Sequence, residues 1–413
     1  MPVRNPFVIG VIVRGTAFTD RAGETKQVLD TILEPGARLL VSGERRTGKT
    51  SVLVRAVESA HRRGVGAALV DCGTAGTPLE IANRLLTQAA RALGRDWGRM
   101  ASDLARALSL KLQFGTDAQT QLPTVTLEPT MAAMSRAEQP KVLEDVLRAL
   151  DARAGRERRP FGVLLDEVQR LLPALGGDAA SEEAAVVAGE WRLRGVLQDL
   201  PHLSVVLAGS EPTMFAAMQT HGRAFYQQFT PLRIGPIAEE HFSRWIDERS
   251  ASAGVRVRGL GAACLRLAGP RTRDVIQLAR ECFAHGAEGQ RGRGGLQADA
   301  LAAAAYADVV AALADPFRGT WESLAIGQRQ VLRAVSAAEV GMTTAATRNR
   351  FGLGASGPVV KSLGALADQR IIVRDGAMPG GWGFDNPFFR GWVVWHTLPD
   401  VGLFLPGTHR PGA

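Results

Sequence analysis

One short segment constrains this chain more than any other: residues 43–51 read GERRTGKTS, between an apolar run and a helical pattern. The spacing of its glycines, lysine and threonine matches GxxxxGK[ST], the pattern of a phosphate-binding loop. Glycines let backbone amides curl around phosphate oxygens, while the lysine and the hydroxyl reach the outer phosphates and a magnesium ion. The motif predicts ATP as ligand and Mg²⁺ as cofactor, bound by Gly43, Glu44, Arg45, Arg46, Thr47, Gly48, Lys49, Thr50 and Ser51.

The rest of the first half of the chain predicts an α/β fold around this loop. Short apolar runs alternate with long helical patterns, which is typical of a parallel sheet with crossover helices. Their near-continuous hydrophobicity predicts burial on both faces of the sheet. A stretch of alternating apolar residues over 108–130 predicts an inserted β-hairpin. The five expected strands are 37–43, 66–73, 161–167, 203–210 and 229–237.

The second half predicts two helical parts. Helical patterns alone follow Glu239, which indicates a helical lid, and the glycine-rich residues 286–295 indicate a flexible linker. An alanine-rich helix over about 296–314 precedes three short helical patterns and two strand-like runs within 371–389, the order of a winged helix. The expected domains are an α/β core (1–238), a lid (239–290), a linker with a connecting helix (291–317), a winged-helix domain (318–400) and a tail (401–413).

Two carboxylates are expected beside the loop. The segment LLDEVQ places Asp166 and Glu167 at the C-terminal end of a buried strand, the edge at which ligands of parallel sheets gather. Asp166 would hold Mg²⁺ with Thr50, and Glu167 would polarise the attacking water. Ser210 ends another strand, so its hydroxyl would touch the same water or the terminal phosphate. The alternatives are a carboxylate pair and a serine that only cap local structure.

Taken in order, the segments GERRTGKTS, LLDEVQ, VVLAGSEPTMF, GRAFYQQFTPLRIGPI and AGPRTRD resemble the AAA+ superfamily. More narrowly, the chain is similar to the archaeal and bacterial ATPases related to origin-recognition ATPases and to STAND switches. The resemblance covers about residues 5–395. It implies a AAA+ sheet, a lid, a terminal winged helix and hydrolysis of ATP.

The resemblance also implies an adenine pocket near the N-terminus. Phe18 and Arg21, in FTDRAGE, match the segment that lines this pocket, where the aromatic ring would pack on the base. The alternative for Phe18 is ordinary core packing. Asp20 stands where the family commonly has glycine, which leaves the conformation of the local turn open.

Three further arginines receive roles from the resemblance alone. Arg271 and Arg273 match the lid segment that delivers an arginine to the terminal phosphate, and Arg273 is favoured because a helix starts directly after it. Arg223 lies where relatives carry an arginine that acts on a neighbouring subunit, in an ATP-dependent homo-oligomer. A solvated surface arginine is the alternative for each of them.

The partner of the winged helix stays open between double-stranded DNA and a protein. The helix expected to read DNA, over 356–370, carries Lys361 and Arg370 as its only cations, and Arg348 and Arg350 precede it. Residues 318–413 contain ten basic and six acidic residues, too small an excess to demand phosphate binding. A scaffold that binds ATP structurally is a further alternative. The nearby aromatic residues favour core packing over base stacking: Trp382, Phe384, Phe388, Phe389, Trp392 and Trp395.

Composition adds few constraints. The chain has 413 residues, 46% of them hydrophobic and 22% charged, and a net charge of +8, which permits contact with a polyanion. Its three cysteines are too few and too scattered for a disulfide framework or a zinc cluster, which favours a reducing cytoplasm. No apolar run is long enough to suggest a membrane span.

Overall fold

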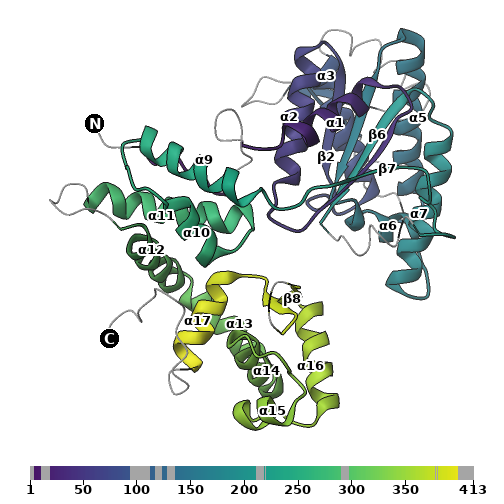
Figure 1. The fold of residues 1–413 in the computed structure, drawn as a ribbon. Helices are drawn as coiled ribbons and strands as arrows, with labels where there is room; N and C mark the ends of the chain where they lie inside the picture. The colour runs from purple at the N-terminus through teal and green to yellow at the C-terminus, as the bar shows by residue number, and fades with distance from the viewer. Residues whose placement is uncertain are drawn as a thin grey trace. The chain divides into compact units, whose positions relative to one another are not determined.

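The computed structural model of the chain divides into two compact units (Figure 1). One unit comprises residues 12–235, and the other comprises residues 1–11 with 236–413. The structure describes residues 4–10, 19–93, 112–116, 123–127, 135–210, 218, 220–289, 297–376, 378 and 380–398.

A five-stranded parallel sheet forms the centre of the first unit, with strand order β2-β5-β6-β1-β7. Each predicted strand is present, shortened by one to five residues at its ends. Strand β6 lies between β1 and β5, so the loop after β1 and the carboxylates after β5 flank the end of β6. This order confirms the expected α/β fold with a parallel sheet. The strands are β1 (Arg38–Ser42), β2 (Gly66–Asp71), β5 (Phe161–Asp166), β6 (Leu203–Gly209) and β7 (Thr230–Arg233).

Helices cover both faces of this sheet (Figure 1). Alternate side chains of one strand enter opposite cores, as the pleat requires. Leu39 and Val41 pack under helices α1 and α2, whereas Leu40 lies in the core below α3, α5 and α7. Because both cores are apolar, the strands have the near-continuous hydrophobicity that identifies them in the sequence. The helices are α1 (Ala22–Leu33), α2 (Lys49–Arg62), α3 (Pro78–Leu93), α5 (Gln139–Glu157) and α7 (Glu182–Gln198).

Smaller elements complete the first unit. The predicted inserted hairpin is present as an antiparallel pair, β3 (Leu112–Thr116) and β4 (Pro123–Leu127). After β5 the chain forms a short 3₁₀ helix, η4 (Val168–Arg170), and then α6 (Leu172–Gly176). These two turns connect the end of β5 to α7.

The lid consists of α9 (Glu239–Ser252), α10 (Leu260–Ala268) and α11 (Thr272–Gly289). The N-terminal segment packs on it, because Phe7 is buried in the lid core and Arg280 donates to the Phe7 carbonyl oxygen at 2.9 Å. The expected linker over 286–295 is wrong for residues 286–289, which form the last turn of α11. Residues 290–295 lie outside the described ranges.

The C-terminal part has the helix and strand order of a winged helix, as predicted. Two features differ from expectation. The connecting region contains two helices instead of one, and the segment NPFF, expected to be strand-like, opens a further helix because the Asn386 side chain accepts from the Phe388 and Phe389 amides. The elements are α12 (Ala298–Ala312), α13 (Ala314–Ser323), α14 (Ile326–Ser336), α15 (Ala345–Phe351), α16 (Ser356–Asp368), β8 (Ile372–Arg374), β9 (Trp382–Phe384) and α17 (Pro387–Thr397).

One hydrophobic core runs through the whole second unit. It joins the lid, the N-terminal segment and the winged helix, and the Tyr306 hydroxyl donates to the Pro387 carbonyl oxygen at 2.6 Å between α12 and α17. Within the described ranges no single helix has the length and apolarity needed to cross a membrane, and α12 and α13 meet that criterion only as a pair, bent by 59°. All six aromatic residues expected to pack are buried: Trp382, Phe384, Phe388, Phe389, Trp392 and Trp395.

The close approach of α6 and α7 yields a stability prediction. A Cβ atom added at Gly189 of α7 would lie 2.0 Å from the Leu172 carbonyl oxygen, which is backbone and cannot yield. We expect Gly189→Ala to destabilise the protein by about 1–3 kcal/mol. The matched control is Gly195→Ala in the same helix, where nothing lies within 4 Å and a gain of about 0.5–1 kcal/mol is expected. Equal midpoints of urea unfolding for the two variants would contradict this packing.

Candidate nucleotide site

The predicted phosphate-binding loop turns sharply between the end of β1 at Ser42 and the start of α2 at Lys49. Gly48 has a φ of 94°, a conformation that side-chain-bearing residues rarely adopt. Arg46 is also left-handed, with a φ of 69°, so the loop stores backbone strain of about 1 kcal/mol or more. Thr47 is buried, and its hydroxyl donates to the Glu44 carbonyl oxygen at 2.8 Å. These contacts hold the loop in a compact turn at the N-terminus of α2.

Lys49 is buried within the loop. Its ammonium donates to the carbonyl oxygens of Gly43, at 3.0 Å, and Glu44, at 2.6 Å. Burial lowers the pKa of Lys49, while the nearby carboxylates of Glu167 and Asp166 oppose that shift. Backbone carbonyl oxygens and two acidic side chains therefore stabilise the positive charge of Lys49 beside the loop.

A cavity of about 300 Å³ opens beside the loop. It combines cations from the loop with one carboxylate from the end of β5, which suits a polyanion that carries a bound cation. Its lining residues are Arg45, Arg46, Gly48, Lys49, Thr50, Ser51 and Glu167.

Thr50 and Asp166 meet at the edge of the sheet. The Thr50 hydroxyl donates to Asp166 Oδ2 at 2.6 Å, and the Glu167 amide donates to Asp166 Oδ1 at 3.0 Å. Burial raises the pKa of Asp166, and the neighbouring charges of Glu167 and Asp71 raise it further against the Thr50 and Glu167 hydrogen bonds. A hydroxyl and a carboxylate oxygen are ligands that Mg²⁺ prefers, and a cation would relieve the repulsion between these acids. The donor set therefore fits magnesium.

Glu167 is held by two neighbours at the same carboxylate oxygen. The Ser210 hydroxyl donates to Glu167 Oε2 at 2.8 Å, and the Gln169 amide nitrogen donates to the same atom. Ser210, the residue that follows β6, thus contacts the carboxylate directly. Sequence reasoning missed Gln169, although it stands in the same LLDEVQ segment.

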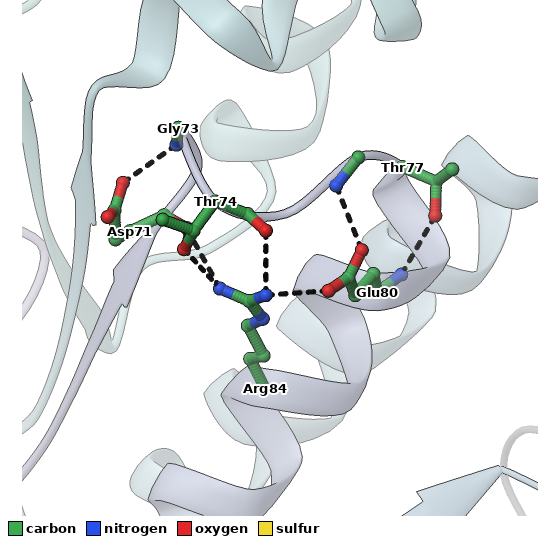
Figure 2. Close-up of polar contacts among 7 residues, drawn as sticks. Asp71, Gly73, Thr74, Thr77, Glu80 and Arg84 are labelled. Carbon is green, nitrogen blue, oxygen red and sulfur yellow. Dashed lines mark hydrogen bonds and ion pairs between the residues drawn. The ribbon is translucent and has the colours of Figure 1, made fainter.

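The turn after β2 packs against Glu167 and was also missed. A Cβ atom on Gly73 would lie 3.5 Å from Glu167 Cβ, and Asp71 pairs in register with Asp166. Figure 2 shows how Arg84 of α3 holds this turn: it donates to the Thr74 carbonyl oxygen at 2.8 Å and to Glu80 at 2.6 Å.

The sequence carries a signal for this turn. The Glu80 amide donates to the Thr77 hydroxyl at 3.2 Å, and the Glu80 carboxylate accepts from the Gly76 amide at 2.9 Å (Figure 2). The segment TPLE has the spacing of a capping box, which marks the start of α3, although the Glu80 carboxylate bonds the amide one residue before Thr77. It predicts a helix start, but it does not predict that the preceding turn contacts Glu167.

Arg21 is buried at the start of α1 and ties three segments together. Its guanidinium donates to the Gly235 carbonyl oxygen at 2.5 Å, to the Thr47 carbonyl oxygen at 3.4 Å and to Glu24 at 2.8 Å. Asp20 adopts a φ of 42°, so the aspartate takes the left-handed turn commonly made by glycine. Phe18 lies outside the described residues.

Arg223 forms an ion pair within its own unit. Its guanidinium donates through Nε to Glu190 Oε2 at 2.9 Å and through Nη2 to the other carboxylate oxygen. Glu190, on α7, is fully buried, and its hydrogen bond raises the pKa of Arg223. This two-point contact links α7 to the segment before β7.

The two lid arginines differ in their surroundings. Arg271 pairs with Asp385, at 2.9 Å from its carboxylate, and so joins the lid to the winged helix within the second unit. Arg273 is exposed in the first turn of α11. Among the described residues, no group of three histidine, cysteine or acidic side chains is arranged to hold a metal ion.

Comparison with solved structures finds similar chains at low sequence identity. The structural neighbours are origin-recognition and Cdc6 proteins. The Aeropyrum pernix ORC1 protein, in complex with DNA, is 16% identical, with a TM-score of 0.46 over 92% of this chain and 93% of that one. The ADP form of A. pernix ORC2 is 15% identical, with a TM-score of 0.46 over 90% of each chain. Cdc6p from Pyrobaculum aerophilum is 12% identical, with a TM-score of 0.40 over 94% and 96%.

At the level of sequence, no protein-family model and no curated protein matches the chain. The three neighbours named above are only 12–16% identical to it. The description of the fold therefore depends on the strand order of the chain itself, and that of the candidate site on its own residues.

The buried carboxylate predicts a gain in stability on neutralisation. Since burial raises the pKa of Asp166, its charged form is held at a cost to the folded protein. We expect Asp166→Asn to raise the melting temperature at pH 8 without nucleotide, measured by circular dichroism. The matched control is Asp178→Asn, an exposed aspartate between α6 and α7, which should change the melting temperature little. A lower melting temperature for Asp166→Asn would contradict this account.

Proposed function

We propose that the chain is an ATP-hydrolysing AAA+ switch. The observation that carries the proposal is the 2.6 Å contact between the Thr50 hydroxyl and Asp166, beside a cavity lined by the loop and Glu167. It brings a hydroxyl from the loop and a carboxylate from β5 to one point, although 116 residues separate them in the chain. This pairing suits a nucleotide with its magnesium ion.

In this proposal the side chains of the loop and sheet divide the work. The loop amides and Lys49 bind the β- and γ-phosphates, and Thr50 and Asp166 would hold Mg²⁺, which supplies charge neutralisation for the phosphates when bound. Glu167 accepts a proton from the water that attacks the γ-phosphorus. The bond from that phosphorus to the bridging oxygen of ADP then breaks, and ADP leaves with those electrons. Ser210 orients Glu167.

Further residues extend the proposal beyond the loop. Phe18 and Arg21 would line the adenine pocket, and Arg273 would be the lid arginine that senses the terminal phosphate. The contacts favour this choice over Arg271, since Arg271 is engaged by Asp385. Because the lid and winged helix share one core, we propose that nucleotide state moves them as a single body.

An assembly role is part of the same proposal. Arg223 would act on a neighbouring copy in an ATP-dependent homo-oligomer only if its ion pair with Glu190 opened. Opening this ion pair costs free energy, which binding of a neighbouring copy would have to offset. We propose a cytoplasmic location for this activity, on the small number of cysteines in the sequence.

The winged helix is proposed to bind double-stranded DNA. Lys361 is exposed on α16, and Arg374, at the end of β8, is exposed with its guanidinium 3.9 Å from the centre of the Trp382 ring. Arg348 and Arg350, the other basic residues considered for DNA contacts, are less available for them. Arg350 pairs with Glu339 at 2.7 Å, and the Arg348 side chain is half-buried. A protein partner is the second candidate.

One exposed apolar side chain favours that second candidate. Val360, next to Lys361 on α16, is 59% exposed. An apolar group at this position suits a protein surface better than a phosphate backbone. A STAND-like switch that acts on a protein would use this face, and a scaffold that binds ATP without hydrolysis would use it too.

Two substitutions test the hydrolytic role. We expect Lys49→Ala to abolish ATP binding because it removes the cation at the outer phosphates. Glu167→Gln should bind ATP like the parent but lower the rate of phosphate release by about 10²-fold or more, since it removes the general base. Calorimetric titration with ATP and a phosphate-release assay measure these outcomes. Lys26→Ala, an exposed lysine of α1, is the control. Equal hydrolysis by Glu167→Gln and the parent would contradict the assignment.

A third substitution tests the DNA proposal. Lys361→Glu should weaken binding to duplex DNA and reduce the slope of log affinity against log salt by about 1. Fluorescence anisotropy at several salt concentrations measures both effects. Lys141→Glu makes the same charge change on α5 of the other unit and should leave binding unchanged. Absence of DNA binding by the parent at low salt would favour the protein partner.

A further inference from the structure

We propose that Gln169 is a positioning residue for hydrolysis: its amide holds the carboxylate of Glu167 so that one oxygen stays directed to the attacking water. This inference rests on the proposed ATPase function and adds a residue that acts through Glu167 without contact to the nucleotide.

The contacts define this role. Gln169 Nε2 donates to Glu167 Oε2, and the Ser210 hydroxyl donates to the same oxygen at 2.8 Å. Gln169 Nε2 also lies 3.4 Å from Ser210 Oγ, so the three groups form a closed triangle. No donor among the described residues reaches Glu167 Oε1. Both anchoring hydrogen bonds therefore occupy one side of the carboxylate and leave the other for a proton from water.

The local backbone explains how this triangle forms. Glu167 follows β5 in a left-handed conformation, with a φ of 52°, and the chain then enters the 3₁₀ turn η4. Hydrogen bonds from the Arg170 amide to the Glu167 carbonyl oxygen and from the Leu171 amide to the Val168 carbonyl oxygen, both 2.9 Å, fix that turn. The turn brings Gln169 back toward the end of β6, where Ser210 lies.

The burial of Gln169 indicates that packing is not its purpose. Its side chain is only 6% exposed, and its Oε1 atom has no hydrogen-bond partner among the described residues. A buried acceptor left unsatisfied opposes folding, so an apolar side chain of the same length would suit this core position better. The contact with Glu167 compensates for this cost through its effect on activity. Loss of the Gln169 amide should therefore lower activity while stability stays the same or rises.

The test is Gln169→Met, which keeps the length of the side chain and removes both polar atoms. We expect kcat for ATP hydrolysis to fall by about tenfold or more, a part of what a positioned general base contributes. KM and the Kd for ATP should stay within about twofold, because no group that contacts the nucleotide has changed. The melting temperature should stay the same or rise. A residue with a merely structural role would show a lower melting temperature instead.

Two companion variants sharpen the test. Gln169→Glu keeps the shape but places a second carboxyl group against Glu167, which shares a proton with the general base or repels it, so its kcat should fall at least as far. The matched control is Ser204→Ala on β6, which removes a buried hydroxyl that donates to the Ile32 carbonyl oxygen at 3.2 Å, remote from Glu167. It should lower the melting temperature and leave kcat unchanged. Gln169→Met combined with Ser210→Ala should lose less than the product of the single losses, since both act on one oxygen.

The outcomes separate this inference from the proposed function. If the parent hydrolyses ATP and both Gln169 variants keep kcat within about twofold, the inference is overturned and the ATPase function stands. A loss of kcat matched by an equal loss of ATP affinity would also overturn it. If the parent does not hydrolyse ATP, both proposals fail together. Should Gln169→Met not fold, the result with Gln169→Glu decides.

Discussion

The buried carboxylate of Asp166, with the Thr50 hydroxyl on one of its oxygens, is the interaction around which the candidate site is built. Burial opposes its charge, and Glu167 adds a second carboxylate directly after it. Such an arrangement is costly unless cations lie nearby. Lys49 provides one from the phosphate-binding loop, and the donor set suits a magnesium ion. The unfavourable free energy of these neighbouring carboxylates thus favours binding of a charged ligand at this edge of the sheet.

Backbone strain and buried polar side chains are concentrated at the same edge of the sheet. Arg46 and Glu167 both adopt left-handed backbone conformations without being glycine, and Gln169 keeps a buried polar side chain beside them. Each feature lowers stability locally, and the apolar cores on the two faces of the sheet offset that loss. The turn that Arg84 holds packs next to Glu167. The geometry of the carboxylate is therefore set from several segments at once.

The second unit has a different organisation. Lid, N-terminal segment and winged helix share one core, and polar contacts such as Arg271 with Asp385 strengthen the junction. A hinge between lid and winged helix would have to expose buried aromatic side chains of α17, which opposes such motion. A response to nucleotide would therefore involve the unit as a whole.

The sequence by itself determined the parallel sheet, the inserted hairpin, the glycine turn between β1 and α2 and the winged-helix order, because buried strands, amphipathic helices and glycine turns leave local patterns. It also indicated that Thr50, Asp166, Glu167 and Ser210 come together, since residues after parallel strands meet at one edge. Only the tertiary structure decided the rest. The partners of Arg223, Arg271 and Gln169 lie on other segments or depend on the turn between them, and no local pattern records such contacts. For the same reason the last turn of α11, the start of α17 and the packing of the N-terminal segment on the lid were not predicted: each depends on a core assembled from distant parts of the chain.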